Sequence, residues 1–556
     1  MPASPARFWV MVFVLLGAAA TVQFVTVRNE SQIYDESNQL LTGCTYLKTG
    51  HYTIGFEQPP LLKLLWAIPV AMMRPDPPPS GSRLVEDQWR AGQDFLYHNR
   101  LPADSMLMAG RSCAIAISVL LGVAIAFWAR RHFGARVALL AVFLFACDPN
   151  FLANGRYIKN DVGAALLIFA AAMTWGAYLM RPSRKLLLFS GLALGLALAT
   201  KFSALILVPV MLILYVIRRW QERRGFGIGE CARSFGAAGL VACFVIFAAY
   251  GFDVTPLNES PTFHRLIPGF PANRVPVPAL GYFRGLLDIG VKQTEGGLSS
   301  AYLLGEHSQF GWWYMSPVAF AAKTPLAELA LLAIAAGLAL QRLRRVRLRD
   351  VEFHWFLLVI PPAAYFAVSL PIHFHAGMRH LLPLDPFLFV FAAAVLLGGP
   401  VPEWRWTAVA AGAALLILES AAIYPHYLAF FNALAGGPTG GRRLLVDSNL
   451  DWGQDVKNLK TYLDARRIPE VCISYFGMAD LDYYGIRHTG LPAVPDAGAA
   501  RNLDCVAAIS VTNLAMERSR YAGLDALRPD ARIGYSIYVY DLRKRRPAGG
   551  GRGPSM

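Results

Sequence analysis

Residues 8–36 read FWVMVFVLLGAAATVQFVTVRNESQIYDE. The stretch begins with an apolar run, 8–27, and ends a few residues later in the acidic pair Asp35-Glu36. An apolar run of this length predicts a helix that crosses the bilayer, because about twenty residues span roughly 30 Å of hydrocarbon. The acids would lie at the bilayer edge, near a second stretch, FEQPPLLK at 56–63, whose Pro-Pro step fixes the direction of the chain. An ordinary loop has no need of carboxylates there, so the pattern indicates chemistry at the membrane surface.

The composition is that of a polytopic membrane protein. Of the 556 residues, 55% are hydrophobic and 16% are charged, and the mean hydropathy is +0.39, which is too apolar for a soluble globular protein. The formal net charge is +15, but Lys and Arg fall mostly in short clusters between apolar runs. Clusters of this kind set membrane orientation, so the charge does not indicate nucleic-acid binding.

Apolar runs of nearly membrane-spanning length predict about eleven transmembrane helices. The run 186–217 is broken only at Thr200-Lys201, and a charge is costly at mid-bilayer, so we place Lys201 at a membrane surface. The predicted spans are 8–27, 106–129, 136–153, 161–180, 186–200, 201–217, 233–251, 316–340, 353–370, 378–397 and 405–423.

The basic clusters predict the orientation of these spans. When eleven spans are threaded, the clusters near 130–136, 181–185, 218–224 and 342–349 all fall on one side, which the positive-inside rule makes cytoplasmic. The segments expected outside are 28–105, 154–160, 252–315, 371–377 and 424–556. The competing interpretation is that residues 1–25 are a signal peptide cut near Ala18-Ala19-Ala20.

The segments expected outside differ in character. In the first outer loop, 28–105, the apolar stretch Leu61 to Met73 is too short to span and predicts a helix lying in the interface, which would bring Asp35 and Glu57 into one shallow cavity. The large outer loop, 252–315, ends in aromatic residues that are typical of an interfacial belt.

The segment after the last span has ordinary polarity and predicts a small α/β domain over 424–545. Alternating apolar stretches at 443–446, 471–475 and 533–540 predict strands, and 455–463 has helical spacing. Cys472 and Cys505 could form a disulfide if this domain is outside. The basic, Gly-rich tail 546–556 is expected to be disordered, which leaves 1–423 as the transmembrane domain.

Four acids are candidates for the chemistry: Asp35, Glu36, Glu57 and Asp161. A carboxylate at the bilayer surface can accept a proton from a hydroxyl or bind a metal. For an isolated Asp-Glu pair, a solvated helix cap is the more frequent meaning. The pair is not isolated, however, because Glu57, Asp161 and the Arg379-His380 pair are all expected at the same outer face.

Several blocks of the sequence resemble the lipid-carrier-dependent glycosyltransferases of the GT-C superfamily, in particular bacterial relatives of glycosyltransferase family 39, over most of the chain. Their order and their common placement outside the membrane carry the resemblance. The blocks are YDE at 34–36, GHY at 50–52, EQPPLLK at 57–63, NGRYIKND at 154–161, GWWY at 311–314, KTPL at 323–326, GMRHLLP at 377–383 and DSNLDWGQD at 447–455.

The chain departs from two well-known branches of that family. Protein O-mannosyltransferases have His at the position of Gln58, and the lipid A aminoarabinose transferase has Lys there. The block at 447–455 is absent from both. The resemblance therefore implies a separate bacterial branch and does not carry over the identity of the sugar or the acceptor.

The resemblance implies transfer of a sugar from a polyprenyl-phosphate donor to an acceptor hydroxyl at the outer face of a bacterial cytoplasmic membrane, with inversion. Asp35 would be the general base, and Glu36, Glu57 and Asp161 would orient the acceptor, the donor or a divalent ion. Cations would stabilise the departing phosphate, and each has an alternative role as an interfacial anchor. The candidates are Lys63, Arg156, Arg274, Lys323 and Arg379, with Lys63 and Arg379 favoured.

Dependence on a metal stays open at this point. Candidate ligands of Mg²⁺, Mn²⁺ or Zn²⁺ are Asp35, Glu57, Asp161, His373, His375 and His380, but no His pair has the i, i+4 spacing of a committed site. The block at 447–455 could bind a sugar or could be a turn in which Asp451 caps a helix starting near Gly453. We do not place the catalytic site there.

Two other functional classes compete with a monosaccharide transferase. A glycan ligase or polymerase would also use a lipid-linked donor, and the arginines of 252–315 (Arg265, Arg274 and Arg284) suit it. A lipid transporter without chemistry would show internal repeats, helices broken in pairs and charges at mid-bilayer, none of which is clear in the sequence.

Overall fold

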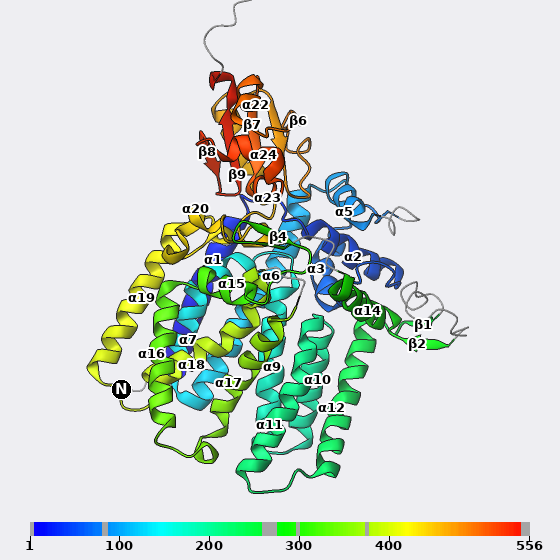
Figure 1. Ribbon diagram of the computed structural model, residues 1–556. Coiled ribbons are helices and arrows are strands. Elements are labelled where there is room, and N and C mark those ends of the chain that lie inside the picture. Colours follow the sequence, from blue (N-terminus) through cyan, green and yellow to red (C-terminus); the bar gives the residue numbers. More distant parts are fainter. Residues whose placement is uncertain (1–4, 80–86, 258–274, 296–300, 373–376, 546–556) are drawn as a thin grey trace, which may run out of the picture.

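The computed structural model describes residues 5–79, 87–257, 275–295, 301–372 and 377–545. It consists of a bundle of long helices, a layer of shorter helices across one end of that bundle, and a sheet domain beyond this layer (Figure 1). The fold is therefore mostly helical with a small C-terminal sheet domain, as the sequence predicts.

Within the described residues, seven helical segments are long and apolar enough to cross a membrane. They account for seven of the predicted spans; six have boundaries that differ by a few residues, and α16 begins ten residues after the start predicted for 316–340. These segments are α1 (Pro5–Val27), α6 (Ala103–Phe133), α9 (Asn160–Met180), η1 (Phe202–Ile206) with α11 (Leu207–Gln221), α12 (Ile228–Ala249), α16 (Leu326–Leu343) and α19 (Glu403–Ile423).

The remaining predicted spans form shorter helices: α7 (Ala135–Cys147), α10 (Arg184–Leu198), α17 (Phe353–Ser369) and α18 (Asp385–Leu397). The predicted span 136–153 breaks because Asp148 accepts hydrogen bonds from the amides of Asn150 and Phe151 and so starts a separate helix, α8 (Pro149–Asn154). The predicted span 316–340 likewise divides at Thr324-Pro325 into α15 (Met315–Lys323) and α16. Apolar length alone does not register these breaks.

The layer across the end of the bundle is built largely from the first outer loop (Figure 1). The interfacial helix predicted at 61–73 is α3 (Leu61–Met72), and it packs beside α2 (Glu36–Thr49) and α6. Further elements of this layer are α5 (Gln88–Tyr97), α14 (Leu280–Glu295), the antiparallel pair β1 (Val254–Pro256) and β2 (Pro276–Pro278), and the antiparallel pair β3 (Ala301–Leu303) and β4 (Glu306–Ser308).

Short 3-10 turns lie in the loops of the bundle, in the segment that connects the bundle to the C-terminal domain and at the end of that domain. They matter because two of them, η4 and η8, carry residues of the candidate site. The turns are η3 (Leu348–Asp350), η4 (Gly377–His380), η5 (Leu382–Leu384), η6 (Tyr427–Ala429), η7 (Ala433–Ala435), η8 (Asp447–Asn449) and η9 (Leu542–Arg545), and a short helix, α20 (Gly437–Gly441), lies between η7 and η8.

The C-terminal domain contains a five-stranded mixed sheet in the order β6-β5-β7-β9-β8. β5 pairs in parallel with β6 and β7, whereas β9 is antiparallel to β7 and β8. The strands are β5 (Val471–Ser474), β6 (His488–Gly490), β7 (Val506–Ser510), β8 (Ala531–Ile533) and β9 (Ile537–Asp541), and the helices are α21 (Val456–Ala465), α22 (Ala497–Asn502), α23 (Val511–Met516) and α24 (Arg518–Asp525).

Most of the predicted elements of this domain are present, with two errors. The predicted strand 533–540 is interrupted by a turn at 534–536 and belongs to two antiparallel strands, β8 and β9. The prediction of a strand at 443–446 is wrong, because these residues form turns that lead into η8. Leu445 and Val446 are buried against the domain core all the same. A short apolar stretch is compatible with either conformation, and packing decided between them.

Backbone hydrogen bonds join the C-terminal domain to the segment that precedes Asp35. The amide of Ser31 donates to the carbonyl of Gln454 over 2.9 Å, and the amide of Tyr34 donates to the carbonyl of Trp452 over 2.9 Å. The Ser31 hydroxyl donates to the Gly453 carbonyl over 2.9 Å. The block at 447–455 is therefore held against the first outer loop, although more than 400 residues separate them in sequence.

Cys472 of β5 and Cys505, which directly precedes β7, form the disulfide that the sequence allowed. The described residues also include five free cysteines. We predict that, after denaturation without reductant, five of the seven cysteines react with a maleimide, and that all seven react after reduction. Removal of the disulfide by Cys472→Ser should lower the stability of the domain by about 2–4 kcal/mol.

Cys472→Ser also provides the control for this thiol count. Its six remaining cysteines should all react without reductant, because Cys505 has lost its partner. Reaction of all seven wild-type thiols without reductant would show that the pair is reduced in the cell.

Candidate active site

Asp35 lies at the start of α2 and pairs with Lys159, the residue that precedes α9. The Lys159 ammonium donates a hydrogen bond to Asp35 Oδ2. Asp35 is the N-cap residue of α2, but its side chain makes no capping hydrogen bond, and only 8% of the residue is exposed. The solvated helix cap considered from the sequence therefore does not describe this carboxylate.

Asp161 provides a second buried carboxylate from the first turn of α9. Its Oδ1 accepts a hydrogen bond of 2.5 Å from the ammonium of Lys201. Lys201 lies just before η1, where the long apolar run 186–217 is interrupted. The charge that the sequence predicts at a membrane surface is thus the partner of an acid.

Arg379, on η4, connects these two ion pairs. Its Nη1 lies 4.0 Å from Asp35 Oδ2 and 3.7 Å from Asp161 Oδ2. A single guanidinium therefore faces both carboxylates. We call Asp35, Asp161, Lys159, Lys201 and Arg379 the charged cluster; it joins residues from four separate parts of the chain.

The C-terminal block lies against the cationic side of the charged cluster. The Arg379 guanidinium is centred 4.5 Å from the ring of Trp452, and the Lys159 ammonium lies 5.4 Å from the same ring. Arg379 Nε also donates to the Ser448 hydroxyl over 3.0 Å. Trp452 is buried, so these cation–π contacts are shielded from solvent. Cation–π contacts are stronger in such a desolvated site than at an exposed one.

Gly377 allows η4 to approach this block closely. Its φ is +65°, and a Cβ at this position would lie 2.0 Å from Asn449 Oδ1. The amide of the next residue, Met378, donates to the same Asn449 oxygen over 3.0 Å. A side chain at 377 would push η4, and Arg379 with it, away from the C-terminal domain.

Other acids of the block at 447–455 have structural partners. Asp451 Oδ2 accepts a hydrogen bond of 3.0 Å from the Thr512 amide, and burial raises the pKa of Asp451 to about 7. Asp455 Oδ2 accepts one of 2.6 Å from the Ser536 hydroxyl. α21 begins at Val456, so Asp451 does not cap a helix starting near Gly453 but ties the block to α23.

Glu36 points away from Asp35 into a fully buried ion pair with Arg111 of α6. Two hydrogen bonds, of 2.6 and 2.9 Å, join the guanidinium to the two carboxylate oxygens. The same oxygens accept the amides of Ile33 and Ile158 over 2.9 and 3.1 Å. Because its acceptor positions are occupied by the protein, Glu36 positions the loops that carry Asp35 and Lys159.

Arg156 does not reach the charged cluster, so the prediction that it binds the donor phosphate is corrected. Its guanidinium is fully buried, donates to Glu30 Oε1 over 2.7 Å and contacts the Thr26 hydroxyl. The Tyr157 hydroxyl donates to the other Glu30 oxygen over 2.8 Å. The arrangement joins the end of α1 to the turn before α9 and leaves no access for a donor phosphate.

Lys323 is also an internal anchor. Its ammonium donates to the carbonyls of Leu428 and Asn449 over 2.9 and 2.6 Å and lies 4.5 Å from the ring of Phe431. The interfacial anchor considered from the sequence is wrong for this residue, because the side chain is buried inside the protein. We therefore do not retain Lys323 as a phosphate ligand.

Glu57 and Lys63 form a separate group beside the charged cluster. Gln88 of α5 donates to Glu57 Oε1, and the Lys63 ammonium donates to the carbonyls of Gly55 and Gln58. Burial lowers the pKa of Lys63 to about 8, while the charge of Glu57 opposes that change. These two hydrogen bonds of Lys63 hold the backbone of the loop 55–58 in place. Glu57 remains partly exposed.

Three further predicted residues, Arg274, His373 and His375, lie outside the described residues. His380 is described and ends η4, directly after Arg379. In the part of the chain that the structure describes, no group of three or more His, Cys, Asp or Glu residues has an arrangement that could hold a metal ion.

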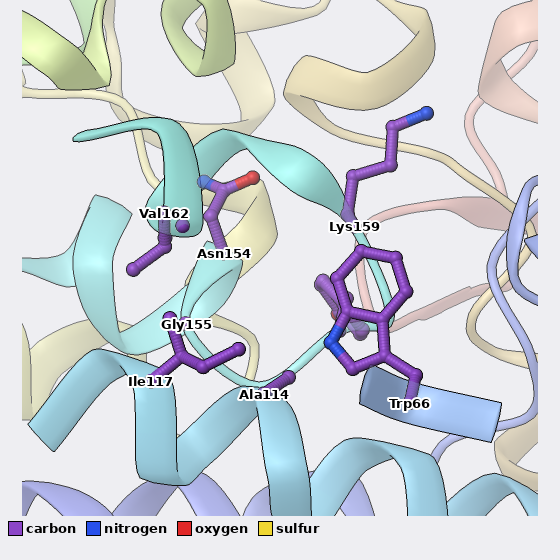
Figure 2. Close-up of a pocket in the computed structure, with 9 residues that line it drawn as sticks. Trp66, Ala114, Ile117, Asn154, Gly155, Lys159 and Val162 are labelled. Carbon is purple, nitrogen blue, oxygen red and sulfur yellow. The ribbon is translucent and has the colours of Figure 1, made fainter. Parts of the chain in front are cut away.

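A small pocket between α3, α6 and the turn before α9 lies next to the charged cluster (Figure 2). Trp66, Ala114, Ile117 and Val162 give it a mostly apolar lining. Figure 2 shows the amino group of Lys159 pointing away from Trp66 and the rest of this lining. The cationic end of Lys159 therefore belongs to the charged cluster and not to the pocket.

Sequence reasoning missed the two lysines of the charged cluster. Lys159 lies inside the block 154–161 but is not among the candidates, and the break in the apolar run predicts only a membrane-surface position for Lys201. A usable signal existed, because an unpaired charge at an apolar helix end needs a partner and Asp161 was available. The contact of Trp452 with both cations has no local signal, since it depends on the docking of a distant domain.

Comparisons with known proteins relate part of the chain to one family. Residues 103–250 match a family model described as Dolichyl-phosphate-mannose-protein mannosyltransferase. A segment is 32% identical over 111 residues to Dolichyl-phosphate-mannose--protein mannosyltransferase 1 of Saccharomyces cerevisiae. That match covers 19% of this chain and only 13% of the yeast protein.

Two solved structures resemble the whole chain at low identity. ArnT from Cupriavidus metallidurans bound to undecaprenyl phosphate matches with a TM-score of 0.48 and 14% identity, covering 96% of this chain and 97% of that one. The Archaeoglobus fulgidus oligosaccharyltransferase in the apo form matches with a TM-score of 0.45 and 14% identity, covering 92% and 72%. Likenesses at these scores decide neither substrate nor mechanism.

The buried pair Glu36–Arg111 gives a prediction about stability. Glu36→Gln should lower the free energy of unfolding by about 3–5 kcal/mol, because it leaves Arg111 charged, buried and without its carboxylate. Thermal unfolding in detergent measures the loss. The matched control is Asp464→Asn, which removes an exposed i, i+4 partner of Lys460 and should cost less than about 1 kcal/mol.

A double variant distinguishes this role from chemistry. Glu36→Gln combined with Arg111→Met removes both charges and should recover part of the lost stability. Unchanged stability of the single Glu36→Gln variant would contradict the positioning role.

Proposed function

We propose that this chain, a member of the GT-C superfamily of membrane glycosyltransferases, transfers a sugar from a polyprenyl-phosphate carrier to an acceptor hydroxyl. The observation that carries the proposal is the charged cluster. It places two carboxylates and three cations at the end of the bundle that faces the C-terminal domain. Glycosyl transfer from a phosphate carrier needs both kinds of group in one place.

Asp35 is the proposed base. The acceptor oxygen attacks the anomeric carbon while the bond from that carbon to the phosphate oxygen breaks, and the electron pair leaves with the polyprenyl phosphate. The proton of the acceptor hydroxyl moves to Asp35. Attack from the side opposite the phosphate inverts the anomeric configuration, as the resemblance implies.

Arg379, Lys159 and Lys201 are the proposed phosphate partners. Of these, only Arg379 belongs to the cations expected from the sequence. When the donor phosphate arrives, the Lys159 ammonium can turn from Asp35 to the phosphate, which leaves Asp35 free to accept a proton. Asp161 keeps Lys201 and Arg379 in place during this exchange.

An apolar groove beside α14 is a candidate for the lipid part of the donor. Leu257, Val277, Leu280 and Phe283 line it, and so does Arg284. The Arg284 guanidinium lies 3.9 Å over the ring of Phe56, next to Glu57. An apolar groove that ends at a cation beside the first outer loop suits a long isoprenoid chain with a phosphate head.

The proposed orientation places the charged cluster outside. The connection between α11 and α12 and the one between α16 and α17 carry dense basic residues, and both lie at the end of the bundle opposite the C-terminal domain (Figure 1). The positive-inside rule would make that end cytoplasmic. The disulfide supports an oxidising compartment, such as the bacterial periplasm, for the C-terminal domain.

A ligase or polymerase that moves whole glycans is the second candidate. The observation that favours it is Arg284, an arginine of the large outer loop whose guanidinium lies over the ring of Phe56, the residue before Glu57. Donors separate the two candidates, because a monosaccharide transferase uses a single sugar on the carrier and a ligase uses an oligosaccharide.

Asp35→Asn should lower the rate of transfer by about a hundred- to ten-thousand-fold, because the variant lacks the carboxylate that accepts the proton. Membranes with wild-type or variant protein are incubated with a panel of radiolabelled polyprenyl-phosphate monosaccharides, and the protein, lipid and glycan fractions are counted. The fraction that gains label also identifies the acceptor class. The matched control, Asp464→Asn, should transfer at the wild-type rate.

Equal transfer by Asp35→Asn and wild type would rule out Asp35 as the base. If the wild type transfers nothing from any monosaccharide donor but does so from an oligosaccharide donor, the ligase is correct.

Arg379→Lys should raise the KM for the donor by roughly ten- to a hundredfold. Lysine keeps the charge but cannot face Asp35, Asp161 and Ser448 with one planar group. Initial rates over a range of donor concentrations measure the effect. Arg156→Lys is the contrasting variant, and it should lower thermal stability without a specific change in donor KM. If instead Arg156→Lys raised the donor KM and Arg379→Lys only lowered stability, Arg156 would be the phosphate ligand and Arg379 the structural residue.

A further inference from the structure

We propose that Asp447, from the C-terminal domain, is a second proton-accepting carboxylate of the reaction centre, which takes the proton from Asp35 after transfer. The inference rests on the proposed function. The block at 447–455 lies outside the catalytic site that is expected from the sequence. Trp452, Asp451 and Asp455 have the structural partners described above, whereas Asp447 directly precedes Ser448, whose hydroxyl accepts a hydrogen bond from Arg379 of the charged cluster.

The placement of Asp447 is built by its neighbours. Its amide donates to the Thr512 hydroxyl of α23 over 3.1 Å, and its Oδ1 accepts the Ser448 amide over 2.6 Å. The Ser448 hydroxyl accepts a hydrogen bond from Arg379, so the residue after Asp447 contacts the central cation of the charged cluster directly. Asp447 is thereby attached to the sheet domain on one side and to the reaction centre on the other.

The backbone of Asp447 adopts an unusual conformation. Its φ is +57°, in the left-handed region that costs free energy for any residue with a side chain, although Asp and Asn tolerate it better than most. Such conformations persist where surrounding contacts enforce them, and they cluster at functional sites. Glycine would fit this backbone without strain, which provides a useful variant below.

Asp447 interacts electrostatically with charged groups from three other segments: Asp35 from the start of α2, Lys159 from the turn before α9 and Arg379 from η4. Burial, and after it the charges of Asp35, Asp447 and Asp87, raise the pKa of Tyr34. Burial raises the pKa of Asp447 to about 6; Arg379 and Lys159 oppose that rise and Asp35 adds to it.

The two carboxylates suit successive roles. A proton on Asp35 prevents the ion pair between Asp35 and Lys159 from re-forming. Passing that proton to the ionised Asp447 restores Asp35 and its pair with Lys159 before the next donor binds. No bond other than the two O–H bonds changes in this step, and the proton leaves Asp447 for solvent at neutral pH. A proton acceptor works best when its pKa is close to the working pH.

The test is the pH dependence of transfer by Asp447 variants in membranes, with the polyprenyl-phosphate monosaccharide that the wild type uses. Wild-type kcat should fall as the pH drops below about 6, because protonated Asp447 cannot accept a proton. The donor is a phosphodiester and does not titrate there. Asp447→Asn and Asp447→Gly should lower kcat by about tenfold or more and lose this dependence near pH 6.

Asp447→Gly separates chemistry from folding. Glycine removes the carboxylate and also relieves the left-handed conformation, so thermal stability should be equal to or higher than that of the wild type. Asp447→Glu should keep part of the rate and a dependence on pH. Asp464→Asn, an exposed change in α21 of the same domain, should match the wild type in rate and pH profile.

Two results would overturn the inference while leaving the proposed function intact. One is a wild-type rate in Asp447→Asn and Asp447→Gly. The other is a reduced rate with the dependence near pH 6 retained, which would indicate a purely structural role. Absence of transfer by the wild type itself would instead reject the proposed function.

Discussion

The placement of one guanidinium, that of Arg379, governs the arrangement of the reaction centre. Two carboxylates that lie close together in a buried site cannot both stay ionised unless cations compensate them, because an unpaired buried charge costs several kcal/mol. Arg379 faces both Asp35 and Asp161, while Lys159 and Lys201 compensate one carboxylate each. The cluster therefore has three cations for two carboxylates before any donor binds, and a donor phosphate would meet cations that are already in place.

This balance requires the C-terminal domain. Arg379 rests on the ring of Trp452 and donates to Ser448, and the same block accepts backbone hydrogen bonds from the segment that leads into Asp35. The domain thus contacts both the central cation and the backbone next to the base. The proposed role of Asp447 would add a residue of this domain to the chemistry itself.

Two buried ion pairs frame the site without taking part in it. Glu36–Arg111 joins α2 to α6 and holds the amides of Ile33 and Ile158, and Glu30–Arg156 joins the end of α1 to the turn before α9. Asp35 and Lys159 each follow directly on a segment fixed in this way. Successive residues at a helix start point in different directions. Glu36 therefore holds the surrounding loops in place, whereas its neighbour Asp35 belongs to the charged cluster.

The sequence by itself determined the membrane-protein class, the helix positions, the small C-terminal sheet domain and the acidic residues at one end of the bundle, because apolar length, charge clusters and local blocks are written in contiguous residues. It predicted Asp35, Asp161 and Arg379 as members of one face. Only the tertiary structure decided that Arg156 and Lys323 are internal anchors, that Lys159 and Lys201 are the partners of the acids, and that residues 447–452 reach the reaction centre. The physical reason is that an ionisable side chain acquires its role from its partner, and these partners lie far away in sequence and meet only when the chain has folded.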